Sequence, residues 1–222
     1  LSRRQRQMCI RDRTHVGRLA FPIFAFLAVE GYFHTRSFKR YALRMLLFAV
    51  LSEVPFDLMY GGTVFYPVHQ NVIWTLLLGL LGIRLMEAAR AKGKRWLYVL
   101  TCAAVVELGF ALGTLGMVDY YGAGVLTVFA FYFFRERKWW CLLGQLAALY
   151  WLNVVVLGGQ MYPVTLFGRE IELCEQGLAL LALVPIWLYR GRQGHHSKAF
   201  QYACYAFYPA HMLVLALLTM IQ

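Results

Sequence analysis

The sequence predicts an all-α protein built as a polytopic bundle of transmembrane helices, and three observations carry this prediction. The first is composition: 60% of the 222 residues are hydrophobic and 15% are charged, with a mean hydropathy of +0.55. Soluble domains contain about 45–50% apolar and about 25% charged residues. The second observation is a series of apolar stretches, and the third is the alternation of charge in the loops between them.

The apolar stretches are long enough to be membrane spans. A helix needs about 20 apolar residues to cross a hydrocarbon core of about 30 Å. Eight stretches meet or approach this length, and in chain order they are 17–33, 41–60, 72–88, 96–114, 117–134, 139–158, 174–190 and 199–221. Residues 14–222 are therefore expected to form a single transmembrane domain.

The loops alternate in charge. Every second loop is rich in Lys and Arg, and these loops are 34–40, 89–95, 135–138 and 190–198. The other loops, 61–71, 114–119 and 158–170, contain no Lys or Arg except Arg169. The positive-inside rule places the basic loops in the cytoplasm. Because this rule also explains the net charge of +11, no nucleic-acid partner is expected.

The first residues do not fit this topology. The alternation makes the span 17–33 run from outside to inside, yet the segment before it is basic, and basic tails resist translocation. Its "RQMCIRDR" also resembles a translated sequencing-adapter read-through. Residues 1–13 are therefore expected to be a non-native leader, and a further helix is expected before Gly17.

Polar side chains gather at the predicted outer ends of the spans. Glu53 and Asp57 are four residues apart and share one helix face, and ionisable groups within a span are functional candidates by default. We expect them to form an external-facing polar site in which Arg18 is the countercharge of Asp57 or Glu53. The other outer candidates are His69, Gln70, Asn71 and Asp119.

A second group could extend a polar path through the membrane. Glu30 and His34 lie four residues apart near the inner end of the first span, and Glu107 and His211 fall near mid-membrane. Structural interpretations of the candidates stay open at this stage. They are interfacial positions for Arg18, His34 and Asp119, a helix-locking pair for Glu53 and Asp57, a solvated loop position for His69 and a packing role for His211.

Several chemistries have no motif in this sequence. The serine-hydrolase GxSxG, the zinc-binding HExxH, the P-loop and GxGxxG are all absent. The five cysteines show no CxxC spacing, so no metal site is expected. The remaining inventory of carboxylates, histidine and arginine suits general acid–base transfer, in which a base takes a proton from an amine or a hydroxyl.

Four stretches together resemble the TraX family, which is named for a conjugative-pilin acetylation protein. They are the block from "GRLAFPIFAFLAVEGYFHT" to "SEVPFDLMY", then "HQNVIWTLLLGLLGI", "DYYGAGVL" and "YACYAFYPAHMLVL". The resemblance runs from Gly17 to about Gln222. The family is similar in outline to multispan membrane acyltransferases such as the acyltransferase-3 group.

The resemblance implies a multi-pass acyltransferase of the bacterial inner membrane. Its donor would be cytoplasmic acetyl-CoA or another acyl-CoA, and its acceptor an amine or hydroxyl of a protein or cell-envelope molecule. Asp57, His69 and Glu53 would be catalytic, and His69 and Asn71 would orient the acceptor or the thioester. His34 and the basic loops would meet CoA. The remaining substrate-binding candidates are Arg18, Glu30, Gln70, Asp119 and His211.

One departure from the family concerns the base. Family members carry an Asp-His pair in a helix ahead of the block at Gly17, and His15 does not match it. A chain without that pair is expected to be inactive. Two alternatives remain: a transporter or permease that uses the intramembrane carboxylates, and a non-catalytic membrane assembly subunit.

Overall fold

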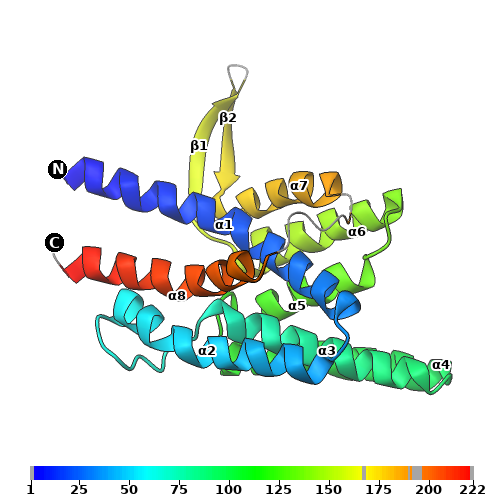
Figure 1. The fold of residues 1–222 in the computed structure, drawn as a ribbon. Helices are drawn as coiled ribbons and strands as arrows, with labels where there is room; N and C mark the ends of the chain where they lie inside the picture. Colours follow the sequence, from blue (N-terminus) through cyan, green and yellow to red (C-terminus); the bar gives the residue numbers. More distant parts are fainter. Residues whose placement is uncertain (1–2, 167–168, 190, 192–196, 221–222) are drawn as a thin grey trace. The chain divides into compact units, whose positions relative to one another are not determined.

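A computed structural model describes residues 3–166, 169–189, 191 and 197–220, and in these residues it confirms the all-α prediction apart from one β-hairpin (Figure 1). The elements are α1 (Arg3–His34), α2 (Phe38–Gly61), α3 (Val72–Ala91), α4 (Arg95–Leu115), α5 (Tyr121–Phe133), α6 (Trp139–Tyr150), the π-helix η1 (Trp151–Leu157), β1 (Met161–Leu166), β2 (Arg169–Cys174), the 3₁₀-helix η2 (Glu175–Ala182), α7 (Leu183–Leu188) and α8 (Lys198–Met220). Within the described residues, each of the eight predicted apolar stretches is therefore mainly helical.

Among the described residues, three helices are long and apolar enough to cross a membrane on their own. They are Val72–Ala91, Arg95–Leu115 and Trp139–Leu157, the last formed by α6 and η1 together. Three shorter helical segments are also apolar, at Tyr121–Phe133, Glu175–Leu188 and Tyr202–Leu218. The predicted span 174–190 is thus a 3₁₀ turn followed by a short α-helix, which makes it shorter than expected.

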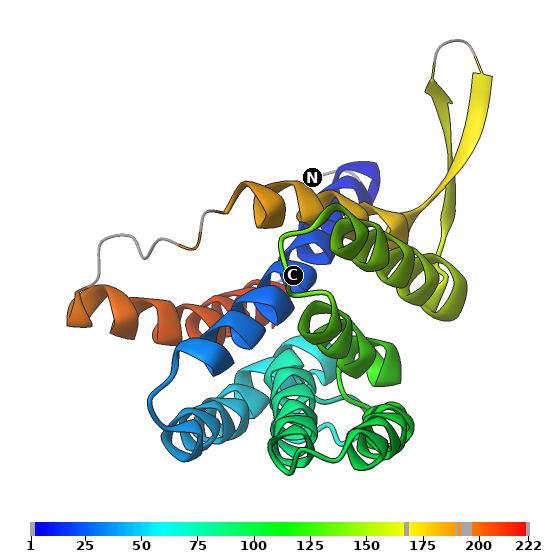
Figure 2. The same ribbon diagram turned by 90° about the vertical axis from the view of Figure 1, so that its right-hand side faces the viewer.

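The chain folds as two compact units. One unit contains Leu1–Gly31 and Leu126–Arg190, and the other contains Tyr32–Val125 and Gly191–Gln222. In the first unit, η1 continues α6 and both pack against η2, which in turn contacts α7 and β2. In the second unit, α2 packs against α8 and α3, and α3 packs against α4 (Figures 1 and 2).

The predicted loop 158–170 is wrong in part, because it forms most of an antiparallel hairpin. The strands pair from Met161 opposite Cys174 to Leu166 opposite Arg169, and the hairpin extends beyond the helices of its unit (Figures 1 and 2). The β-branched residues Val164, Thr165 and Ile171 favour strand conformation. The low charge of this segment correctly indicated a connection between two spans, but charge does not predict whether a connection forms paired strands.

Glycines set the close packing at the start of α5. A Cβ on Gly113 of α4 would lie 2.9 Å from the Cα of Gly122, and a Cβ on Gly124 would lie 2.7 Å from Cγ2 of Thr75 in α3. Larger residues would push these helices apart, because a close-packed interior yields little to an added methyl group. The turn that precedes α5 is therefore held against the first turns of α3.

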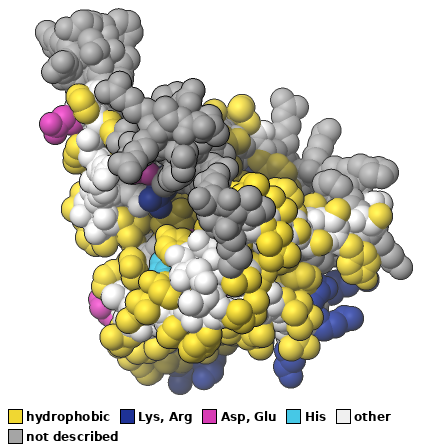
Figure 3. Space-filling model, turned by 90° about the vertical axis from the view of Figure 1, so that its left-hand side faces the viewer, with side chains coloured by type: hydrophobic (Ala, Val, Ile, Leu, Met, Phe, Trp, Pro, Cys, Tyr) yellow, Lys and Arg dark blue, Asp and Glu magenta, His cyan; other side chains and the backbone are white. Residues whose placement is uncertain are grey.

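Much of the apolar surface remains outside the core. Leu80, Ile83 and Met86 of α3 are fully buried, whereas α4 exposes large apolar side chains along its length, among them Val99, Leu100, Leu108, Leu112 and Leu115. Hydrophobic side chains also dominate the coloured part of the face in Figure 3. Apolar exposure on this scale fits a lipid surrounding rather than water.

Candidate functional site

The loop before α3 pairs with the turn before α5, and this pairing creates the site in the second unit. The backbone N–H of Gln70 donates to the carbonyl of Met117 at 2.9 Å, and Gln70 forms a parallel bridge with Val118. His69 therefore lies opposite Asp119, with 3.4 Å between Nε2 and Oδ1. Two residues 50 positions apart in the sequence become a histidine–carboxylate pair.

The turn that carries Asp119 has an unusual backbone. Met117, Tyr120 and Tyr121 adopt positive φ values of 49°, 61° and 50°, a left-handed region that is costly for residues other than glycine. Thr75 of α3 stabilises the turn, because its hydroxyl donates to the Asp119 carbonyl at 2.7 Å. Strain of this kind is characteristic of functional sites, where surrounding contacts keep a side chain in place.

Aromatic rings surround the imidazole of His69. The ring stacks on Phe56 at 5.7 Å and lies 4.9 Å from Tyr60 and 5.9 Å from Tyr121, measured between centroids. The side chain of His69 is only 13% exposed. The rings and Asp119 thus limit the imidazole to one orientation, which is the arrangement expected of a positioned general base.

Glu53 and Asn71 form a second cluster beside this pair. Oε2 of Glu53 accepts hydrogen bonds from Nδ2 of Asn71 and from Nε1 of Trp74, the latter at 2.8 Å. Nδ2 of Asn71 also donates to the Ala49 carbonyl at 2.8 Å. Its Oδ1 caps α3 by accepting from the N–H of Ile73 at 3.0 Å. Asn71 is fully buried, so this cluster locks α2 to the start of α3.

Asp57 closes the loop that leads to His69. Its side chain is 2% exposed, and Oδ2 accepts a hydrogen bond from the N–H of Tyr66 at 2.9 Å. Among the described residues, neither Oδ1 of Asp57 nor Oε1 of Glu53 has a hydrogen-bond partner, although both atoms are buried. Buried acceptors are normally satisfied, so these two oxygens lack hydrogen bonds that the N–H or O–H groups of a ligand or of water would supply.

Tyr208 of α8 completes the cluster and was missed from the sequence. Its hydroxyl lies near the backbone of Val72 and within electrostatic reach of Asp119 and Glu53. The sequence-based choice from the same stretch was His211, whose side chain is exposed and stacks on Phe207 at 5.6 Å. Tyrosine is too common in membrane spans for this one to stand out from the sequence.

Charge is segregated between the two ends of the second unit. Residues 45–83, 96–134 and 199–222 contain no Lys or Arg, so Glu53, Asp57 and Asp119 create a negative potential around His69. Such a potential attracts cations and protonated amines. Within the described part of the chain, no three His, Cys, Asp or Glu side chains are grouped so that they could hold a metal ion.

Arg18 belongs to the other unit. Its Nε lies 3.7 Å from Oε1 of Glu175, with side chains 25% and 12% exposed. The structure thus gives Arg18 a carboxylate partner within its own unit. The expected pairing of Arg18 with Asp57 or Glu53 would join the two units and stays a prediction.

The remaining candidates lie in other surroundings. Glu30 forms a two-point ion pair with Arg135, with Nε–Oε1 at 2.7 Å and Nη2–Oε2 at 3.2 Å. His34 ends α1 with an exposed side chain, and Glu107 is exposed on α4. The Gln70 side chain donates to the Pro67 carbonyl at 3.2 Å and helps to shape the His69 loop. The expected polar path through Glu107 and His211 stays a prediction.

Replacing Arg135 with glutamine is expected to lower the free energy of unfolding by about 1–2 kcal/mol, because Glu30 loses charged hydrogen bonds. The Glu30→Gln change in the same chain is expected to restore part of the loss. A double-mutant cycle, followed by the apparent melting temperature in detergent, measures this coupling. Strictly additive effects of the two changes would contradict the ion pair.

The fold and site define an all-α helical membrane protein with a histidine–carboxylate site. The chain belongs to the TraX family, because the family model described as "TraX protein" matches residues 7–219. It is also 28% identical over 220 residues to the "Probable fimbrial assembly protein FimC, serogroup H1" of Dichelobacter nodosus, covering 95% of this chain and 82% of that protein. No solved structure gives a significant match to the chain.

Proposed function

We propose that the chain is a membrane acyltransferase that moves an acyl group from acyl-CoA, such as acetyl-CoA, to an amine or hydroxyl of a protein or cell-envelope molecule. It would lie in the bacterial inner membrane with its basic loops in the cytoplasm. The observation that supports this most directly is the His69 imidazole, 13% exposed and lying 3.4 Å from Asp119, with aromatic rings around it. Family membership is consistent with the proposal.

The proposed step is a single acyl transfer. The acceptor nitrogen or oxygen attacks the thioester carbonyl carbon, its new bond to carbon forms, and the carbon–sulfur bond breaks. The CoA thiolate leaves with the bonding electron pair. His69 takes the proton that the acceptor loses, and Asp119 stabilises the resulting imidazolium. The proton then passes to the thiolate or to water.

The surrounding carboxyls favour an amine as acceptor. A protonated amine is attracted by the negative end of the unit, and Oδ1 of Asp57 and Oε1 of Glu53 are buried acceptors for its N–H groups. The bound ammonium first gives one proton to water, and the neutral amine then attacks the thioester and loses its second proton to His69. The rings of Phe56, Tyr60 and Tyr121 could also hold a cation through cation–π attraction. Asp57 and Glu53 are therefore proposed to bind and orient the acceptor, and His69 to act as the base.

The test compares acyl transfer with transport in one preparation. The 222-residue chain is reconstituted into vesicles with an envelope extract, and radiolabel is followed from acetyl-CoA into macromolecules. We expect incorporation that falls by about tenfold or more in Asp57→Asn, because the acceptor loses a charged hydrogen bond. The matched control is Glu172→Gln, which changes an exposed carboxyl of the hairpin.

The other outcomes separate the alternatives. Uptake of a solute that depends on Asp57, without incorporation of label, would contradict the proposal and favour a permease. Transfer by this chain would support the proposal with His69 as the base, and it would contradict the expectation from the sequence that the base lies in a helix before Gly17.

A second candidate is a non-catalytic role in assembly, which the name of the Dichelobacter nodosus relative favours. In that case the buried clusters would serve structure alone. Neutralising Glu53, Asp57 and His69 together would then leave surface-fibre assembly in cells intact, provided that the protein stays folded. The acyltransferase proposal expects the loss of any phenotype that depends on acylation.

A further inference from the structure

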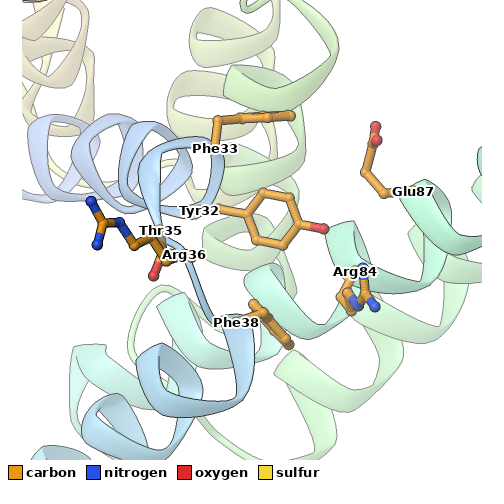
Figure 4. Close-up of a pocket in the computed structure, with 7 residues that line it drawn as sticks. All are labelled: Tyr32, Phe33, Thr35, Arg36, Phe38, Arg84 and Glu87. Atoms are coloured by element: carbon orange, nitrogen blue, oxygen red, sulfur yellow. The ribbon is translucent and has the colours of Figure 1, made fainter.

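A pocket lies at the opposite end of the second unit from His69. It has a volume of about 390 Å³ and is lined by the end of α1, the α1–α2 connection, the first residue of α2 and the later turns of α3, through Tyr32, Phe33, Thr35, Arg36, Phe38, Arg84 and Glu87 (Figure 4). His69 precedes the first turn of α3, whereas Arg84 and Glu87 lie toward its last turns. The pocket and the His69 site are therefore separated along one helix.

The pocket combines aromatic walls with guanidinium groups. In Figure 4, the ring of Tyr32 lies between those of Phe33 and Phe38, and its hydroxyl points to the side where Arg84 and Glu87 lie. Arg36 lines the pocket from the other side of Tyr32. Guanidinium groups suit phosphate oxygens, and aromatic rings provide faces on which a nucleobase can stack.

Charge around the pocket favours an anion. The segments 32–44 and 84–95 contain nine basic residues and one acidic residue, Glu87. Glu87 itself lies 3.4 Å from the guanidinium of Arg90. The carboxylate is therefore partly neutralised, and the end of the unit presents a positive potential, opposite in sign to the end at His69.

Topology alone does not explain Arg84. The positive-inside rule accounts for basic residues in loops, but Arg84 lies within the apolar helix α3, 12 residues after Val72. Its side chain is exposed, seven residues before the end of α3 at Ala91, and an ionisable residue within a span is a functional candidate by default. Because Arg84 lines the pocket, binding a ligand there would give this residue a function.

We propose that this pocket binds the phosphate-bearing nucleotide end of the acyl donor, with Arg36 and Arg84 at the phosphates and Tyr32 and Phe38 against the base. The assignment of CoA as the ligand rests on the proposed function. The step of 12 residues from Val72 to Arg84 corresponds to about 18 Å of helix. An extended phosphopantetheine arm has a comparable length, so a thioester anchored at Arg84 could approach the end of the unit that holds His69.

The test measures binding rather than turnover. Radiolabelled CoA is titrated against the full chain in nanodiscs of neutral lipid. Arg84→Gln and Arg36→Gln are each expected to weaken binding by about 10–100-fold, because each removes charged hydrogen bonds. Arg44→Gln is the matched control, since Arg44 is an exposed residue of α2 that does not line the pocket. Arg84→Lys keeps the charge and is expected to weaken binding less than Arg84→Gln.

The arms of the experiment distinguish a nucleotide from a lipid headgroup. Unchanged CoA affinity in both glutamine variants would overturn the proposal. Loss of co-purified phosphatidylglycerol from these variants, with CoA affinity unchanged, would instead make the pocket a phospholipid site. CoA binding that depends on Arg84, in a protein that transfers no acyl group, would support the pocket while contradicting the proposed reaction.

Discussion

Replacement of His69 by glutamine is expected to lower the rate of acyl transfer by about 10²–10⁴-fold, the contribution typical of a general base. Glutamine is polar and of similar length but cannot take up a proton. The imidazole is 13% exposed and faces Asp119, so water does not readily replace it. Single-turnover transfer of radiolabel from acetyl-CoA measures the chemical step apart from donor binding.

A graded series strengthens this test. Asp119→Asn keeps the size of the side chain but removes the charge that would stabilise the imidazolium, so we expect a clear decrease in rate. The double variant is expected to be no worse than His69→Gln alone, since residues that act as a unit are not additive. A His69→Gln protein that binds CoA, stays folded and transfers at an undiminished rate would show that the base lies elsewhere.

Replacement of Asn71 by alanine is expected to be the most destabilising single change at the site, by about 2 kcal/mol or more. It removes the N-cap of α3, worth about 1 kcal/mol, and leaves the buried carboxylate of Glu53 with one donor fewer, at a cost of about 1–3 kcal/mol. The apparent melting temperature in detergent should fall, with α2 and α3 loosened together.

Asn71→Ser separates the two contributions. Serine can cap a helix but is too short to reproduce both hydrogen bonds from Nδ2 to Ala49 and Glu53. Its melting temperature is therefore expected to lie between those of the wild type and Asn71→Ala. Equal stability of the alanine variant and the wild type would contradict the role assigned to this cluster.

The site was recognisable in part from the sequence. Carboxylates are so costly in spans that Glu53 and Asp57 stand out by position alone, and charge alternation in the loops grouped them with His69, Asn71 and Asp119 at one end. The structure then brings His69 to Asp119 and Glu53 to Asn71. Which residue pairs with which depends on the Gln70–Val118 bridge, and no local pattern in the sequence indicates that bridge.

Other features depend on surroundings that a sequence does not show. Arg84 carried a usable signal, because it is a charge inside a predicted span, but Tyr32 and Phe38 are ordinary interfacial aromatics until the chain turn between α1 and α2 brings them to Arg84. Glu30 was a candidate for substrate binding, yet its carboxylate is bound by Arg135, 105 residues away. The position of Glu30 in a predicted span shows that burying its charge is costly, but it does not show that Arg135 offsets this cost.

The sequence by itself determined that this is an all-α membrane protein. The length of each apolar stretch, the charge of each loop and the cost of placing ions in lipid can be judged segment by segment, without knowing how the segments pack. Only the tertiary structure decided the histidine–carboxylate pair, the place of Tyr208 beside it, the hairpin and the pocket at Arg84. Each of these depends on contacts between residues distant in the chain, whose energies arise from packing and hydrogen-bond geometry rather than from composition or periodicity.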